Sequence, residues 1–99
     1  MTLISDFLDV DSFLQVNPEY RAINRTELDK LEVGMEVRVQ HNGEYLRIRV
    51  DEIDDNIIKG TVVTKLFYQQ HSFVYLDQIQ FYKKNVIDIY DINRWGVKL

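Results

Sequence analysis

Apolar and polar residues alternate strictly on both sides of Asn42-Gly43, in the stretch 35–50. A period of two is typical of a strand with one buried face, and Asn-Gly favours a two-residue hairpin turn because both residues tolerate positive φ. Such a turn determines which residues face each other. The predicted pairs are His41 with Glu44, Val39 with Leu46, Val37 with Ile48 and Met35 with Val50. The apolar members then share one face, so the residues expected to be buried are Val37, Leu46, Ile48 and Val50.

The opposite face of this hairpin is polar and carries three arginines. The predicted register places Arg38 directly opposite Arg47, and like charges opposed in this way destabilise a strand pair by up to ~1 kcal/mol. Glu36 faces Arg49 and can relieve the charge repulsion at one of its neighbours. Tyr45 stands at the turn end of the same face, where its ring can stack on a guanidinium group.

Two interpretations of this polar face are open. In the functional one, Arg38, Tyr45, Arg47 and Arg49 form an anion site in which the arginine forks bind phosphate or carboxylate. In the structural one, the arginines pair with carboxylates on neighbouring elements, for which the candidates are Glu32, Glu44, Asp77 and Asp88. Charge clusters are often structural networks, so both interpretations need a test.

The hydrophobic pattern predicts further strands after the hairpin. Ile53 is out of step with Val50, which predicts a bulge or bend near Asp51-Glu52. A third strand runs from Ile57 through Gly60, where another backbone should approach closely. Later strand segments are expected at 66–68, 73–76, 78–81 and 86–90. Short strands with tight turns and one strong bend favour a mainly β fold, a small SH3-like, partly open antiparallel barrel, with an α+β roll as the alternative.

Short helical elements are predicted before the hairpin. Apolar residues at spacings of three and four over 3–14 indicate an amphipathic helix, with a cap near Asp11-Ser12. Asn17-Pro18-Glu19 indicates a second helical start, and Thr26 to Asp29 has the spacing of a capping box. We therefore expect one domain over 1–99, in which a helical leader (1–34) packs on a barrel (35–91). The tail (92–99) contains Trp95, which should pack against the protein.

The distribution of charge bears on the partners. Residues 1–34 carry seven acids and three bases, whereas residues 35–99 carry nine of each. The acidic leader disfavours binding to duplex nucleic acid, which depends on neutralising phosphates. No apolar run approaches the ~20 residues that span a membrane. The chain has no cysteine, and Asp6, Asp9 and Asp11 argue against a signal peptide, so we expect a cytoplasmic protein.

Catalytic and metal-binding patterns are weak in this sequence. His71 and Ser72 are neighbours in the chain, an arrangement that rarely presents a nucleophile to its base, and His41 stands beside the hairpin turn. The acidic run 51–55 lacks the turn glycines and the distal carboxylate of a calcium loop. The isolated glycines form no phosphate loop. We therefore predict a protein that is not an enzyme, with no catalytic residue, metal site or cofactor.

Short motifs follow a recurrent order between residues 31 and 91: Leu31-Glu32-Val33-Gly34-Met35-Glu36-Val37, Asn42-Gly43-Glu44, Val50-Asp51-Glu52-Ile53, Ile58-Lys59-Gly60-Thr61-Val62, Asp77-Gln78-Ile79-Gln80-Phe81 and Asn85-Val86-Ile87-Asp88-Ile89. In this order they resemble small bacterial barrel domains of the uncharacterised YegJ type. The chain departs from that pattern at Leu46 and Ile48, where the family often has an aromatic residue, and at Leu76, where glycine is usual. The resemblance implies an SH3-like fold and transfers no catalytic residue, because the family has no settled activity.

Three classes of function follow from these features. The leading hypothesis is a non-enzymatic binding domain that holds an anionic small molecule, such as a nucleotide, or an acidic peptide on the polar hairpin face. One version is a small phage protein that sequesters a host nucleotide signal. The alternative is a protein–protein adaptor or inhibitor that acts through its acidic leader, and a homodimer is compatible with either. An enzyme of unrecognised type is the third class.

Overall fold

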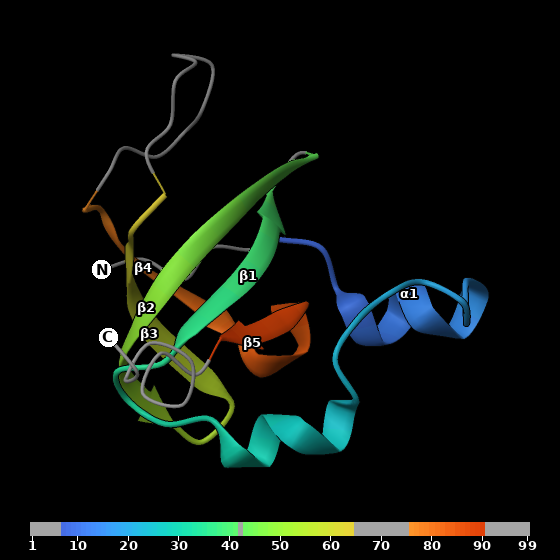
Figure 1. Cartoon of the computed structure of the whole chain (residues 1–99), viewed down its shortest axis with the longest axis horizontal. Helices are drawn as coiled ribbons and strands as arrows, with labels where there is room; N and C mark the ends of the chain where they lie inside the picture. Colours follow the sequence, from blue (N-terminus) through green and yellow to red (C-terminus); the bar gives the residue numbers. More distant parts are fainter. Residues whose placement is uncertain (1–6, 42, 65–75, 91–99) are drawn as a thin grey trace, which may run out of the picture.

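The chain folds around one antiparallel sheet of five strands, in the order β4-β3-β2-β1-β5 (Figure 1). The computed structural model describes residues 7–41, 43–64 and 76–90. The strands are β1 Glu36–His41, β2 Glu44–Asp54, β3 Ile57–Val62, β4 Gln78–Tyr82 and β5 Asp88–Tyr90. The helices are α1 Val10–Val16 and the short 3-10 helices η1 Arg25–Lys30 and η2 Lys83–Asn85. The protein is therefore mainly β, as the hydrophobic pattern predicts.

The sheet is open within the described part of the chain. Strands β1, β2 and β3 each pair with the next strand, and β5 returns to the far side of β1. Strands β4 and β5 are consequently the two edges of the sheet, and no described pairing joins them into a barrel. The mainly β class is confirmed, whereas closure into a barrel is not observed.

The register of the central hairpin is confirmed. Val39 faces Leu46 and Val37 faces Ile48, while Arg38 faces Arg47 on the other side of the sheet. Gly43 has φ +83, as a tight hairpin turn requires. The side chains predicted to be buried are almost inaccessible: Val37 0%, Leu46 1%, Ile48 0% and Val50 0%.

The predicted bend in β2 is also confirmed. The pairing of β2 with β3 shifts register between Val50 and Glu52, which is where the hydrophobic pattern loses its phase. Gly60 lies opposite Val50, and a Cβ atom there would clash with the Ile48 side chain and lie 2.6 Å from the carbonyl oxygen of Arg49. Only glycine allows β3 to approach β2 this closely.

The core lies on one side of the sheet, opposite to the side that carries the arginines. It is built from the inward residues of the strands together with residues of the leader, namely Phe7, Leu28, Leu31, Val37, Val39, Leu46, Ile48, Val50, Ile58, Val62, Ile79, Phe81 and Val86. Phe81 is fully buried and its neighbour Tyr82 is half-buried, as the alternation of a strand requires. The leader therefore contributes to the same core as the sheet.

The helices of the leader differ from the predicted ones. Helix α1 begins at Val10, and its N-cap is Asp9, whose carboxylate accepts a hydrogen bond from the Ser12 backbone N–H. Phe7 is not helical: it pairs with His41 in an isolated bridge and packs edge-to-face on Phe81. The tertiary contacts of Phe7 override the helical spacing, so the predicted helix over 3–14 is wrong for residues 7–9.

The two later starts in the leader also need correction. Asn17 ends α1, because its backbone N–H donates to the carbonyl of Phe13 at 2.9 Å, and Pro18-Glu19 form a turn. The N-cap of η1 is Asn24 rather than Thr26, and its side chain accepts from the Thr26 N–H at 3.1 Å. In both places an asparagine provides the local hydrogen bond that decides the boundary.

A buried asparagine joins the leader to the far end of the sheet. Asn85 is 4% exposed. Its Nδ2 donates to the carbonyl of Leu8 at 3.0 Å, and its Oδ1 accepts from the Tyr82 backbone N–H at 2.9 Å. Since the Asn85 amide is buried, these bonds satisfy it and hold the start of the leader against η2.

Some predictions fall outside the described residues. They concern the strand segments within 65–75, the histidine and serine at 71 and 72, and the tail with Trp95.

Leu76 adopts a backbone conformation that disfavours leucine. Its φ is +75, in the left-handed region that costs a residue with a Cβ about 1–2 kcal/mol. Its side chain is 55% exposed, so burial compensates little. The resemblance described above implies a glycine at this position, which would occupy the same conformation without strain.

Burial of the apolar face of the hairpin leads to a prediction about stability. Replacing Ile48 by Ala should lower the free energy of unfolding by ~2–5 kcal/mol, because it leaves a cavity in the core. Guanidinium unfolding measures the change. Val16→Ala is the matched control, since Val16 is 79% exposed and should change stability by less than about 0.5 kcal/mol. A small effect at Ile48 would contradict the packing of this face.

The strained turn makes a second prediction. Leu76→Gly should raise the free energy of unfolding, by up to about 1 kcal/mol, because relief of the left-handed conformation exceeds the added entropy of the unfolded chain. Gly43→Ala is the converse control, because Gly43 has φ +83 and open space around it. This variant should lower the free energy of unfolding by a similar amount. Destabilisation by Leu76→Gly would show that the leucine side chain contributes more than its exposure indicates.

Candidate functional site

The outward side of β1, β2 and β5 brings together most of the charged residues predicted as a site. This arginine face consists of Glu36, Arg38, Tyr45, Arg47, Arg49, Asp51, Asp88 and Tyr90. Because β5 pairs with β1, it adds Asp88 beside Arg38 and Tyr90 beside Glu36. The four predicted ligand-binding residues therefore lie on one side of the sheet, and β5 supplies further partners.

Arg38 is the most enclosed of the three arginines. It forms an ion pair with Asp88 through Nη2, and its Cζ lies 5.2 Å from the centroid of the Tyr45 ring. Burial by itself would lower the pKa of Arg38, but the hydrogen bond and charge of Asp88 outweigh it and raise that pKa above its ordinary value. The Nε atom of Arg38 is buried without a hydrogen-bond partner. Arg38 thus supports the structural interpretation.

Tyr20 of the leader approaches the same end of the face. Its ring packs edge-to-face on Phe13, with centroids 4.8 Å apart. Burial, followed by the nearby Tyr45, raises the pKa of Tyr20. No local pattern of the sequence indicates that Tyr20 lies near the hairpin.

Arg47 and Arg49 are held differently from Arg38. Arg47 pairs with Glu36 through Nε, and its Cζ lies 4.0 Å from the centroid of the Tyr90 ring. Arg49 pairs with Asp51 through Nε at 3.1 Å. The two side chains are 46% and 48% exposed. Within the described residues, no hydrogen bond uses either Nη atom of these two arginines.

The partners of the arginines were only partly predicted. Asp88 was among the candidates and binds Arg38. Glu36 faces Arg49 across the strands, but its carboxylate binds Arg47 diagonally. Arg49 instead uses Asp51, two residues along its own strand. The face is therefore an ion-pair network, yet Arg47 and Arg49 each contribute only part of their guanidinium group to it.

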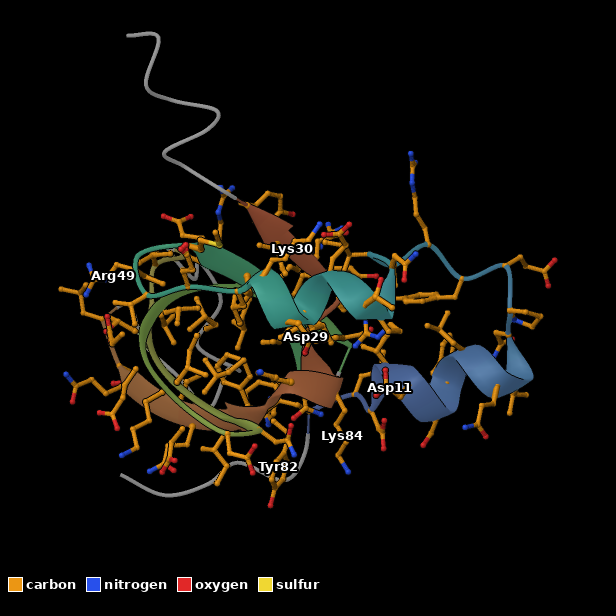
Figure 2. The ribbon with its side chains drawn as sticks, turned by 90° about the horizontal axis from the view of Figure 1, so that it is seen from below. Asp11, Asp29, Lys30, Arg49, Tyr82 and Lys84 are labelled. Atoms are coloured by element: carbon orange, nitrogen blue, oxygen red, sulfur yellow. The ribbon has the colours of Figure 1, made fainter. Side chains whose placement is uncertain are left out.

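A second feature, which the sequence analysis missed, is a cleft of about 410 Å³ between the leader and the β4–η2 region. Figure 2 shows Asp29 of η1 on the side that faces Asp11, Tyr82 and Lys84, with Lys30 on the opposite side of η1. The adjacent pair Lys83-Lys84 was the available signal, but its spacing indicates only a turn. Most of its lining comes from the leader and from residues 82–84, which are more than fifty residues apart in the chain.

In the described ranges 7–41, 43–64 and 76–90, no three His, Cys, Asp or Glu side chains come together as metal ligands. No helix within these ranges is long and apolar enough to cross a membrane.

The raised pKa of Tyr20 makes a pH prediction. Its stabilising contribution is complete below the ordinary value of 10.0 and is lost as pH rises through the higher folded-state pKa, because the folded protein binds the proton more tightly. Tyr20→Phe should therefore reduce the loss of stability between about pH 9 and about pH 11, measured by urea unfolding. Tyr82→Phe removes a hydroxyl outside this cluster and should keep the wild-type dependence. The same dependence of stability on pH in the two variants would contradict the assignment of this loss to Tyr20.

No protein-family model, curated protein or solved structure matches this chain. Its function therefore has to be inferred from the residues and their arrangement.

Proposed function

We propose that this protein is a non-enzymatic binding domain that holds an anionic ligand on its arginine face. One observation carries the proposal: Arg47 and Arg49 are oriented through Nε by carboxylates and leave both Nη atoms without a described hydrogen bond on a half-exposed surface. An arginine held in this way presents two parallel N–H donors that fit the oxygens of a phosphate or carboxylate.

The aromatic residues beside the arginines favour binding as well. Tyr45 is 51% exposed, and Tyr90 lies under the guanidinium of Arg47. Tyrosine and arginine are enriched among the residues that dominate binding energies, because they combine large rigid contact areas with hydrogen bonds. Stacking on Tyr90 also reduces the freedom that Arg47 would lose on binding.

The charge balance of the face limits the class of ligand. Its three arginines are matched by the carboxylates of Glu36, Asp51 and Asp88, so the face has little net positive charge to attract a polyanion. Recognition of a ligand then depends on how well its oxygens fit the guanidinium groups of individual arginines. A nucleotide or an acidic peptide presents the required oxygens, and both remain within the proposal.

The fold and the location belong to the same proposal. A four-strand meander, a bulge that bends β2, and a last strand that returns beside β1 after the short helix η2 support an SH3-like architecture. The YegJ-type resemblance would agree with it. The lack of cysteine supports a cytoplasmic location, where thiols and disulfides are not needed for stability.

The acidic leader supports an adaptor role less well. Asp11 binds Arg25 at 2.6 Å, and Asp9 lies 3.4 Å from the Nζ atom of Lys84. These two acids therefore join parts of the protein to each other, and this use competes with docking on a basic partner. Binding through the arginine face is the stronger hypothesis.

The proposal predicts separate effects of Arg47→Ala on binding and on stability. Affinity for ADP or for a hexaglutamate peptide, measured by calorimetry, should fall at least about tenfold. The melting temperature should stay within about 2 °C or rise, because an exposed ion pair contributes ~0–1 kcal/mol and a like charge opposite Arg38 is removed.

Lys59→Ala is the matched control for this variant. Lys59 also lies on the outward side of the sheet and pairs with Glu52 at 3.3 Å, so it should leave ligand affinity unchanged. A fall of several degrees in the melting temperature of Arg47→Ala, with no loss of binding, would assign the arginines to a structural network and remove the anion site.

A further inference from the structure

The cleft beside η1 is separate from the arginine face and has the dimensions of a small-molecule site. Its volume of about 410 Å³ lies in the range of ~300–1,000 Å³ usual for ligand pockets. Leu28, which is 7% exposed, lies at its wall. The charged residues around it come from three elements and are Asp11, Arg25, Asp29, Lys83 and Lys84.

Arg25 has an incomplete set of hydrogen bonds at this cleft. Its Nε donates to Asp11 at 2.6 Å, and its Nη2 donates to the backbone carbonyl of Lys84 at 3.4 Å. Its Nη1 atom is buried and has no hydrogen-bond partner. A buried cationic N–H without an acceptor is costly, so an oxygen atom supplied from the cleft would stabilise this arrangement.

The two lysines of η2 supply further positive charge. Within the described part of the chain, no ion pair or side-chain hydrogen bond uses the ammonium group of Lys83. Lys84 lies 3.4 Å from the carboxylate of Asp9 and 5.3 Å from the centroid of the Tyr82 ring. Each ammonium group carries three donors and can satisfy more than one acceptor. The lysines can therefore bind an additional oxygen ligand.

Asp29 sets a limit on the charge of the ligand. Three basic and two acidic side chains line the cleft, and Asp11 is already neutralised by Arg25. Asp29 has no described ion-pair partner, and it faces the cleft opposite Lys84. The lining thus favours one compact anionic group and repels an extended polyanion. It also offers Asp29 as an acceptor for a hydroxyl or amino group elsewhere on the ligand.

We propose that this cleft binds the oxyanion group of a small molecule, a phosphate or a carboxylate, with Arg25, Lys83 and Lys84 as its donors. The donors come from η1 and from η2, so the ligand would bridge the leader and the sheet. Phosphate should bind more tightly than carboxylate, because its three or four oxygens can meet donors on both sides of the cleft. The site is independent of the arginine face.

Titration of the full chain with inorganic phosphate and with acetate, followed by ¹H–¹⁵N NMR at constant ionic strength, tests this proposal. Phosphate should give saturable shifts of the backbone amide signals of residues 25, 83 and 84, with weaker shifts from acetate. In the Lys83→Gln/Lys84→Gln variant the dissociation constant should rise at least about tenfold. Asp29→Asn should instead lower it by about fivefold, because it removes a repulsive charge.

Two variants serve as controls. Lys30→Gln removes a lysine on the other side of η1, and Arg47→Ala removes a guanidinium of the arginine face; both should leave phosphate binding at the cleft unchanged. The spectra report directly whether each variant is folded. If the double variant is unfolded, the dissociation constant of Lys83→Gln alone provides the test. Shifts that do not saturate would overturn the proposal. A dissociation constant that is unchanged both in the lysine double variant and in Asp29→Asn would overturn it as well.

Discussion

The register of the β1–β2 hairpin is the constraint on which both the core and the arginine face depend. A two-residue turn with Gly43 at φ +83 pairs Val37 with Ile48 and Arg38 with Arg47. A shift by one residue would exchange the faces, exposing the apolar residues and burying the arginines. Burial of this apolar set therefore enforces the opposed arginines, even though like charges across a strand pair are unfavourable.

The ion pairs of the arginine face determine orientation more than stability. Exposed pairs contribute little free energy, but each fixes one side of a guanidinium group. Arg38 is enclosed by Asp88 and by two tyrosines, and its raised pKa reflects that environment. Arg47 and Arg49 keep their outer donors accessible. The same type of contact thus encloses Arg38 at one end of the face and leaves the guanidinium groups of Arg47 and Arg49 half-exposed.

The leader is joined to the sheet by polar contacts over long distances in sequence. Asn85 binds the carbonyl of Leu8, Lys84 approaches Asp9, and Arg25 reaches the backbone of Lys84. These contacts surround the cleft, so the cleft exists only where leader and η2 meet. A ligand that bridges the two would stabilise their attachment by mass action.

Local features of the sequence determined the hairpin, its register, the bulge after Val50 and the need for glycine at position 60, because alternation and turn chemistry act between near neighbours. The opposition of Arg38 and Arg47 followed from the same reasoning. Tertiary structure alone decided that Phe7 leaves the helical pattern to pair with His41, that Tyr20 meets Tyr45, and that Arg25 and Lys84 share a cleft. These contacts join segments far apart in the chain, and neither periodicity nor capping carries information about which distant segments will meet.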